Sequence, residues 1–245
     1  MAPSPDHPDL ILPPVFSLMV TSGPENAFDE ACAVAASGDA TGRLVWRRSA
    51  EVFDLAVILE PDEPLARARR AFFAGMVALA DAIGAHGPPE IPVTFDWPDT
   101  VRFDGARLGG GRLGWPPACG EDEVPDWLVF SATVIASKAR AGDPGLTPDS
   151  TSLENEGFNV EDGHGPLVES FARHLMKAFA VWDEDGFAGI ERRYLRRLAD
   201  GGPSARMGRI DANGDLLADG GERHPLVAVL TGVAWRDPHT GEPRL

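Results

Sequence analysis

The stretch from residue 93 to residue 115, VTFDWPDTVRFDGARLGGGRLGW, restricts the fold more than any other part of the chain. β-forming residues flank the Trp-Pro-Asp at 97–99, which predicts that the chain extends, turns and extends again. The Asp-Gly pair at 104–105 is typical of a two-residue hairpin loop, so a third strand begins near Arg107. The glycines at 109–111 leave that strand bare, and a bare strand lets a ligand lie against the main chain.

Two long apolar segments predict the centre of the sheet to which these strands belong. Residues 51–60 are almost continuously apolar, and residues 127–136 alternate well enough to form a long strand. A shorter first strand is expected at 15–20. Helices are expected at 24–38, 65–83, 166–182 and 187–198. These elements predict one α+β domain over residues 15–202.

The two ends of the chain differ from this central part. Residues 1–14 contain five prolines, which prevent regular structure and predict an extended N-terminal arm. Between 203 and 245, an Asn-Gly turn at 213–214 and an apolar run at 226–230 are typical of short strands. We therefore expect residues 203–245 to form a small C-terminal β domain.

The charge of the chain excludes one class of partner. Its 22 basic and 38 acidic residues give a formal net charge of −16, which repels a phosphate backbone and argues against nucleic-acid binding. The first residues lack a signal-peptide pattern, and no apolar segment approaches the ~18 residues of a membrane span. We therefore expect a cytoplasmic protein that does not bind membranes. The two cysteines and six scattered histidines show no metal-ligand spacing, so no metal site is expected.

Two short patterns imitate known binding motifs. The glycines at 109, 111 and 114 have the spacing of a dinucleotide fingerprint, but the Trp-Pro-Pro that follows prevents the helix that this motif requires. Acidic and amide residues between 211 and 222 have calcium-loop spacing, but the sixth position is Leu216 rather than glycine. We therefore expect a strand and a hairpin turn at these two places.

The stretch 93–115 resembles the central motif of a known family. Its Trp-Pro-Asp, Asp-Gly, basic residue and glycines are similar to the W-P-N-D … D-G-x-K-x-x-G core of the biotin and lipoate protein ligases. Residues 127–136 resemble the next core strand of that family, and residues 151–157, TSLENEG, are similar to its T-S-L-x-x-E-G segment. The resemblance covers residues 15–200. It implies a mixed, mainly antiparallel sheet flanked by helices, with a small C-terminal β domain.

The same resemblance implies a chemistry. Enzymes of this family join a small carboxylic acid such as biotin or lipoate to AMP, using ATP and magnesium, and transfer it to a lysine of a carrier protein. Their catalytic strand lysine corresponds to Arg107. Residues 41–46 resemble a shortened form of the glycine- and arginine-rich loop that covers the adenylate. The residues implied to contact the ligand are Arg43, Trp46, Trp97, Asp99, Gly109, Gly110 and Gly111.

Three departures from the family pattern bear on catalysis. Asp96 stands where the family has lysine before the tryptophan, Asp99-Thr100 replaces its Asn-Asp, and Arg107 replaces its lysine. Two functions therefore remain open. The first is a divergent ligase, and the second is a catalytically degenerate protein that acts as a small-molecule-binding or accessory protein-interaction factor. The first is favoured if four arginines point into one pocket: Arg43, Arg47, Arg48 and Arg107.

Overall fold

The computed structural model describes residues 10–38, 40–142, 146–159, 163–199, 208–231, 235–237 and 241–245. Seven strands form one sheet in the order β1-β2-β3-β7-β6-β5-β4, and three short strands form a second sheet in the order β10-β9-β8. In the larger sheet β1 and β2 pair in parallel, and the other neighbours pair antiparallel. The strands are β1 (Ser17–Thr21), β2 (Arg43–Arg47), β3 (Val52–Leu59), β4 (Val93–Asp96), β5 (Thr100–Phe103), β6 (Ala106–Gly114), β7 (Leu128–Ile135), β8 (Arg209–Ile210), β9 (Leu216–Leu217) and β10 (Arg223–His224).

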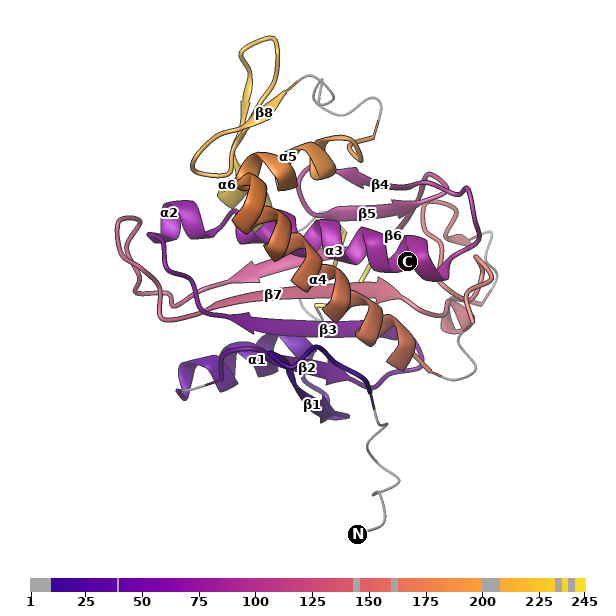
Figure 1. Cartoon of the computed structure of the whole chain (residues 1–245). Helices are drawn as coiled ribbons and strands as arrows, with labels where there is room; N and C mark the ends of the chain where they lie inside the picture. The colour runs from indigo at the N-terminus through magenta and orange to yellow at the C-terminus, as the bar shows by residue number, and fades with distance from the viewer. Residues whose placement is uncertain are drawn as a thin grey trace.

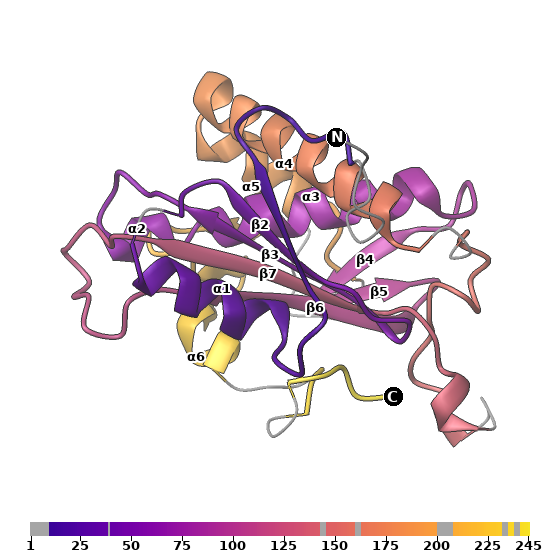
Figure 2. The same ribbon diagram turned by 90° about the horizontal axis from the view of Figure 1, so that it is seen from below.

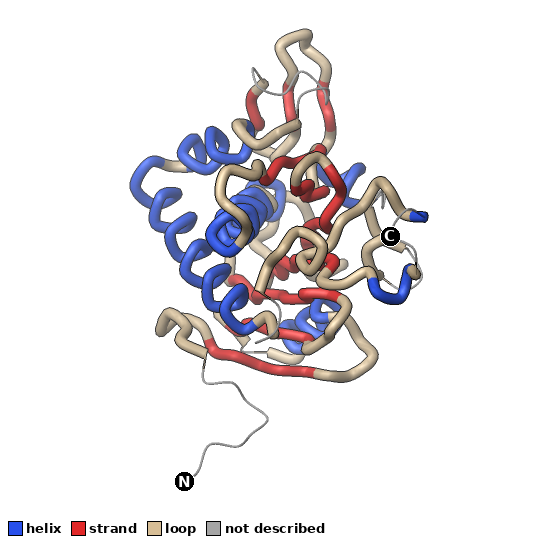
Figure 3. Tube along the Cα trace, turned by 90° about the vertical axis from the view of Figure 1, so that its right-hand side faces the viewer, coloured by secondary structure: helices blue, strands red, loops and turns tan. Residues whose placement is uncertain are grey.

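Helices cover both faces of the larger sheet (Figure 1). Figure 2 shows α3, α4 and α5 on one side of the strands, and α1 with the last residues of the chain on the other. The strands run in a stack through the middle of the molecule in Figure 3. The helices are α1 (Ala27–Ala36), α2 (Leu65–Ala68), α3 (Ala71–His86), α4 (Gly165–Asp185), α5 (Phe187–Leu195), α6 (Leu226–Thr231) and a 3-10 turn, η1 (Ala139–Ala141).

The central position predicted for the two long apolar strands is confirmed. β3 and β7 are paired over eight residues each, and β7 is buried along its whole length. Their side chains alternate, so Phe53 and Phe130 join the core under α3 and α4, whereas Ala56 and Val129 pack under α1. The fold is therefore α+β with a mainly antiparallel sheet, as expected.

The stretch 93–115 forms β4, β5 and β6 in succession. Asp104 and Gly105 both have positive φ, at 49° and 77°, which is the geometry of the predicted two-residue hairpin. Because β6 is a strand from Ala106 to Gly114, the dinucleotide pattern is not a binding loop. The prediction of a hairpin at 211–222 is also confirmed, since Asp211 accepts a backbone bond from Gly214 at 3.0 Å.

Two sequence predictions were wrong. Residues 41–46 were expected to form a shortened loop, but residues 43–47 are β2, which pairs with a strand on each side. Residues 226–230 were expected to form a strand, but they lie in the helix α6. The Asp215 carboxylate accepts the backbone N–H of Leu226 at 2.8 Å and so caps the first turn of that helix. The small sheet β8–β10 itself is present and packs beside α5, where Glu191 accepts a bond from Ile210 N at 2.6 Å.

Some predictions fall outside the described residues. Most of the N-terminal arm, residues 1–9, and the boundary between the two expected domains, residues 200–207, belong to this group. The domain limits at 14/15 and 202/203 therefore stay predictions. Among the helices that the structure describes, none combines the length and the apolar composition needed to cross a membrane.

Candidate ligand site on the α1 face of the sheet

A row of five residues crosses the sheet on the face that carries α1. Arg47 lies opposite Asp54, and Asp54 lies opposite Thr133. Thr133 lies opposite Gly110, and Gly110 lies opposite Thr100. Directly opposed residues of neighbouring strands share a face, so these five positions lie side by side. We call them the polar row.

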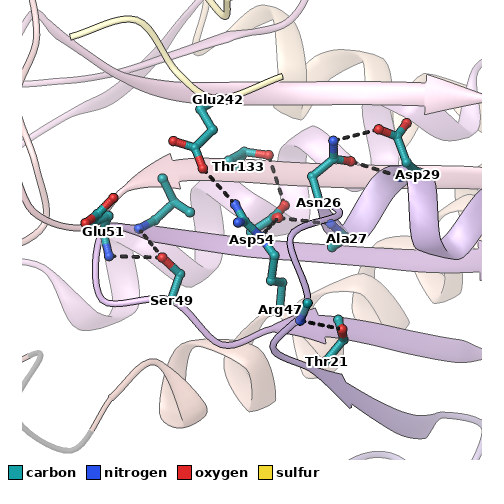
Figure 4. Close-up of polar contacts among 12 residues, drawn as sticks. Thr21, Asn26, Ala27, Asp29, Arg47, Ser49, Glu51, Asp54, Thr133 and Glu242 are labelled. Carbon is teal, nitrogen blue, oxygen red and sulfur yellow. Dashed lines mark hydrogen bonds and ion pairs between the residues drawn. The ribbon is translucent and has the colours of Figure 1, made fainter. Parts of the chain in front are cut away.

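Asp54 is the anchor of the polar row and is fully buried. Its carboxylate accepts hydrogen bonds from Arg47 Nε at 2.7 Å and Thr133 Oγ1 at 3.2 Å, as Figure 4 shows. It also accepts the backbone N–H of Ala27 at 3.0 Å, which ties the start of α1 to the sheet. A buried carboxylate with three donors is well compensated, so this part of the row is rigid.

Asp99 lies just before the Thr100 end of the row and is 5% exposed. Its carboxylate accepts hydrogen bonds from Trp235 Nε1 at 3.0 Å and from Thr100 Oγ1 at 3.2 Å. Burial raises the pKa of Asp99 from 3.8 to about 6, although these hydrogen bonds act in the opposite direction. The carboxyl therefore changes charge only slightly below neutral pH.

Arg107 reaches the same region from the start of β6. Its Nη2 donates to the carbonyl of Arg244 at 3.1 Å, while its Nε is buried and has no partner among the described residues. Its backbone pairs with that of Thr151, the first residue of the TSLENEG segment, at 2.9 Å. Arg107 thus keeps one unused donor in a buried position, and such a donor is unfavourable unless a ligand accepts its hydrogen bond.

Arg112 is a further cation on this face. Its guanidinium lies 3.6 Å from the centroid of the Phe28 ring and 3.8 Å from the Asp29 carboxylate of α1. Burial, together with the charge of Arg236, lowers the pKa of Arg112 to about 10. Arg112 lies opposite Ser131, whose hydroxyl is buried without a partner in the described structure. The face therefore has several cations and two unused hydrogen-bonding groups.

The structure brings only some of the expected site residues together. Asp99, Arg107 and Gly110 belong to the polar row or border it. Gly109 lies tight against β7, since a Cβ there would be 2.2 Å from the Thr133 carbonyl oxygen. A Cβ at Gly111 would instead meet Met76 in the core under α3. By strand alternation Gly109 and Gly111 share the face that carries α3, and Gly110 between them lies on the α1 face with the polar row.

Both expected tryptophans face the opposite core. Trp46 is 4% exposed and lines a cavity of about 420 Å³ with Arg48 and His164. Trp97 stacks on Phe73 of α3 with ring centroids 5.6 Å apart. The expectation that these residues and the glycines surround one site is therefore met only in part.

The four arginines do not converge either. Arg47 and Arg107 reach the polar row, but Arg48 is exposed and its guanidinium lies 5.9 Å from the Trp46 ring centroid. Arg43 shares a strand face with Arg47 but lies four residues away, which corresponds to about 13 Å along a strand. The arrangement offers an anion two predicted arginines and Arg112, rather than the expected four.

Several residues of the site were missed by sequence reasoning. Asp54 left a signal, because a single carboxylate in the otherwise apolar run at 52–59 must find buried partners. Arg112 left a weaker signal, since it follows the three glycines on a predicted strand. Trp235 left none, because its contact with Asp99 joins residues 136 positions apart in the chain.

The described residues hold no group of three or more metal-ligating side chains that could bind an ion. Asp54 and Asp99 are already hydrogen-bonded, and the free groups on this face are mainly donors. Chemically, the face fits an anionic or hydrogen-bond-accepting small molecule that lies on the bare backbone of β6.

Comparison with known proteins points in one direction. A model described as the biotin/lipoate A/B protein ligase family matches residues 12–196. The biotin--[acetyl-CoA-carboxylase] ligase of Paracoccus denitrificans is 30% identical over 178 residues, which are 69% of this chain and 70% of that protein.

Solved structures agree with this match. A biotin protein ligase-like protein of unknown function from Silicibacter sp. TM1040 is 29% identical, with a TM-score of 0.75 over 90% of this chain and 98% of that one. The biotin protein ligase of Aquifex aeolicus, in complex with biotin and ATP, has a TM-score of 0.57 at 13% identity over 84% of this chain and 94% of that one. At that identity the second likeness shows the fold alone.

Proposed function

The chain belongs to the biotin/lipoate A/B protein ligase family, and from this premise we propose that its polar row binds a biotin- or lipoate-like carboxylic acid or the adenylate of that acid. The proposal includes ATP with its magnesium ion as co-substrate and a lysine of a carrier protein as acceptor, in the cytoplasm. The relative from Paracoccus denitrificans is named as a biotin ligase of acetyl-CoA carboxylase.

One observation carries the proposal: Arg107 has a buried, unpartnered Nε beside the glycine backbone of β6. Formation of an acyl-adenylate brings a carboxylate onto the α-phosphate of ATP, and these two anions repel each other. A site for this reaction must therefore supply positive charge where the anions meet. The guanidinium of Arg107 can grip a carboxylate or phosphate with two parallel hydrogen bonds.

Other groups on the same face support the same ligand class. Arg112 adds a second, half-buried cation, and Ser131 adds a hydroxyl without a partner among the described residues. Magnesium binds mainly to substrate phosphates and needs only one or two carboxylates from the protein; Asp99 would supply one once its hydrogen bond with Trp235 is broken. When bound with ATP, the ion neutralises phosphate charge.

A second candidate function is a protein that binds the acid without adenylating it. The observation that favours it is the buried Arg47–Asp54 pair, which ties up one of the two predicted cations of the row. The replacement of lysine by Arg107 points the same way, because a planar guanidinium cannot take the position of a compact ammonium between two oxyanions.

Calorimetry with Arg107→Ala tests the proposal. Biotin, lipoate, octanoate and a non-hydrolysable acyl-adenylate analogue of each acid are titrated into the wild-type protein and the variant. We expect at least one of them to bind the wild type, and Arg107→Ala to weaken that binding by about 1 to 3 kcal/mol, the usual cost of a lost charge-assisted contact.

Arg48→Ala is the matched control, since it removes an arginine from the Trp46 side of the sheet. Its binding should equal that of the wild type. If Arg107→Ala binds as tightly as the wild type, the ligand lies elsewhere and the proposed site is wrong. If none of these acids or analogues binds, the proposed ligand class is wrong.

A further inference from the structure

The polar row is covered by the last residues of the chain. Trp235 is 1% exposed and hydrogen-bonds to Asp99, and its indole lies on the bare backbone of Gly110. A Cβ built on Gly110 would be 2.4 Å from Cε2 of that indole, so the two are in direct contact. The ring therefore occupies the surface on which a flat ligand would lie.

Two further contacts cover Arg47, which belongs to the polar row, and Arg107, which lies on the same face. Glu242 accepts a hydrogen bond from Arg47 Nη2 at 3.2 Å, drawn in Figure 4, and the carbonyl of Arg244 accepts one from Arg107 Nη2 at 3.1 Å. A carboxylate and a carbonyl oxygen thus stand where the oxygens of an anionic ligand would stand. Glu242 and Arg244 thus imitate the ligand class that this face is proposed to bind.

The covering residues form a unit of their own. Arg236 and Pro243 form an isolated antiparallel β-bridge, and the backbone N–H of Arg244 donates to the carbonyl of Trp235 at 2.9 Å. The backbone N–H of Asp237 donates to the carbonyl of Glu242 at 2.8 Å. The described arms, 235–237 and 241–245, are therefore linked to each other, and we call this unit the strap. It lies on the α1 side of the sheet (Figure 2).

The described strap is attached to this face partly through groups at its surface. The side chain of Glu242 is 43% exposed, so water competes for its bond with Arg47. Leu245 is also 43% exposed, whereas Trp235 and Pro243 are buried. Opening of the strap therefore requires Trp235 and Pro243 to leave their buried positions, while Asp54 keeps its own hydrogen bonds to Arg47, Thr133 and Ala27.

We propose that the strap, residues 235–237 and 241–245, competes with the ligand for the polar row, so that ligand enters only after Trp235 leaves Gly110. This inference rests on the proposed function, because it assigns the regulation of the same site. Competition follows from the geometry, since the Trp235 indole and a ligand cannot both lie on Gly110. The apparent affinity then equals the affinity of the open form multiplied by the fraction of molecules in which the strap is open.

A reversible cross-link tests whether the strap closes the row. A Cβ on Gly241 would lie 3.9 Å from Cγ of Asn26, so Asn26→Cys combined with Gly241→Cys places two thiols within reach of a disulfide. The readout is the rate at which phenylglyoxal modifies Arg107 and Arg47, measured by peptide mass spectrometry. We expect oxidation to slow both rates at least tenfold and dithiothreitol to restore them.

Trp235→Ala provides the opposite change in the full-length chain. It should speed modification of Arg107 at least tenfold, and Trp182→Ala, which removes an indole from α4 on the other face, should not. Thermal melting of each variant shows that it is folded before labelling. The acyl-adenylate analogues used for calorimetry are then titrated into the oxidised and reduced forms of the cross-linked variant.

The outcomes separate this inference from the proposed function. Equal modification of Arg107 in the oxidised and reduced forms overturns the strap, whatever the ligand proves to be. Slower modification on oxidation with no analogue bound in either form supports the strap and contradicts the proposed function. Slower modification together with at least tenfold weaker analogue binding on oxidation supports both.

Discussion

Asp99 shows at the scale of one residue how burial and hydrogen bonding oppose each other. Burial raises its pKa to about 6 even though Trp235 and Thr100 both donate to it. The folded protein therefore holds the Asp99 proton more tightly than the unfolded chain, whose carboxyl keeps the ordinary value of 3.8. The stability that this proton contributes is present below pH 3.8 and is lost as the pH rises through about 6.

Asp99→Asn should remove this dependence, because asparagine keeps an oxygen that can accept from Trp235 and carries no charge. As the pH rises from 4 to 7.5, the free energy of unfolding of the variant should increase relative to that of the wild type. The increase should be at most about 3 kcal/mol for a shift of about two pKa units. Urea denaturation at the two pH values measures the gain. Parallel stability curves for the two proteins would show that Asp99 does not titrate in this range.

At the scale of the element, two glycines on the same face of β6 differ in the atoms that they contact. In β6, Gly109 lies against the backbone of β7, whereas Gly111 faces the flexible end of Met76. The required close approach explains why β6 tolerates a run of glycines in spite of its entropic cost. The neighbour of each glycine, rather than its place in a motif, decides what a substitution does.

Alanine substitutions in β6 should therefore differ in their effect on stability. A Cβ at Gly109 would be 2.2 Å from the backbone oxygen of Thr133, which cannot move without breaking the pairing of β6 with β7. A Cβ at Gly111 would be 2.5 Å from Met76 Sδ, which can rotate away. We expect Gly111→Ala to lower the free energy of unfolding by about 1 kcal/mol and Gly109→Ala to lower it by at least about 3 kcal/mol. Overpacking usually costs about 1 to 3 kcal/mol.

The free energies of unfolding in urea test this expected difference between Gly109→Ala and Gly111→Ala. Both variants have to be compared with the wild type at one pH, because Asp99 titrates nearby. Equal losses in the two variants would mean that the backbone contact at Gly109 relaxes as easily as the methionine contact at Gly111.

At the scale of the whole molecule, family membership does not decide whether the chain adenylates biotin. The fold supplies the glycine strand, but Arg107 stands where the resemblance implies a lysine, and residues 43–47, where it implies a covering loop, form β2. A lid that closes over the adenylate excludes water and adds phosphate donors, and residues of β2 are paired on both sides and cannot serve as one.

We therefore expect slow or no release of pyrophosphate when the protein is given biotin, ATP and magnesium. Misplacement of a charged group by about 1 Å can reduce a rate by about a hundredfold. Arg107→Lys alone should not restore the reaction, because residues 43–47 would still be a paired strand rather than a lid. Release on the order of 1 per second with biotin, a typical enzymatic rate, would show that Arg107 carries out the chemistry as it stands. Lipoate and octanoate are run in parallel, so that a general loss of activity is told apart from a loss specific to biotin.

The sequence by itself determined the long strands and the hairpin, because their signals are local. Alternation and continuous apolar runs identified β3 and β7, and Asp-Gly at 104–105 identified the hairpin before β6. The family motif also lies within one short stretch, so the resemblance was visible without a structure. Local signals were misleading at 226–230, where a carboxylate from Asp215 caps a helix in a segment that is apolar enough for a strand.

Only the tertiary structure decided which residues share the site. Strand alternation and sheet register placed Arg47, Asp54, Thr133 and Gly110 in one row, although they come from four separate strands. The same alternation turned Trp46 and Trp97 toward the opposite core. The strap depends on contacts between residues more than a hundred positions apart, such as Trp235 with Asp99 and Arg244 with Arg107. A pattern along the chain has no record of such pairs, because they form only when the sheet brings distant strands onto one face.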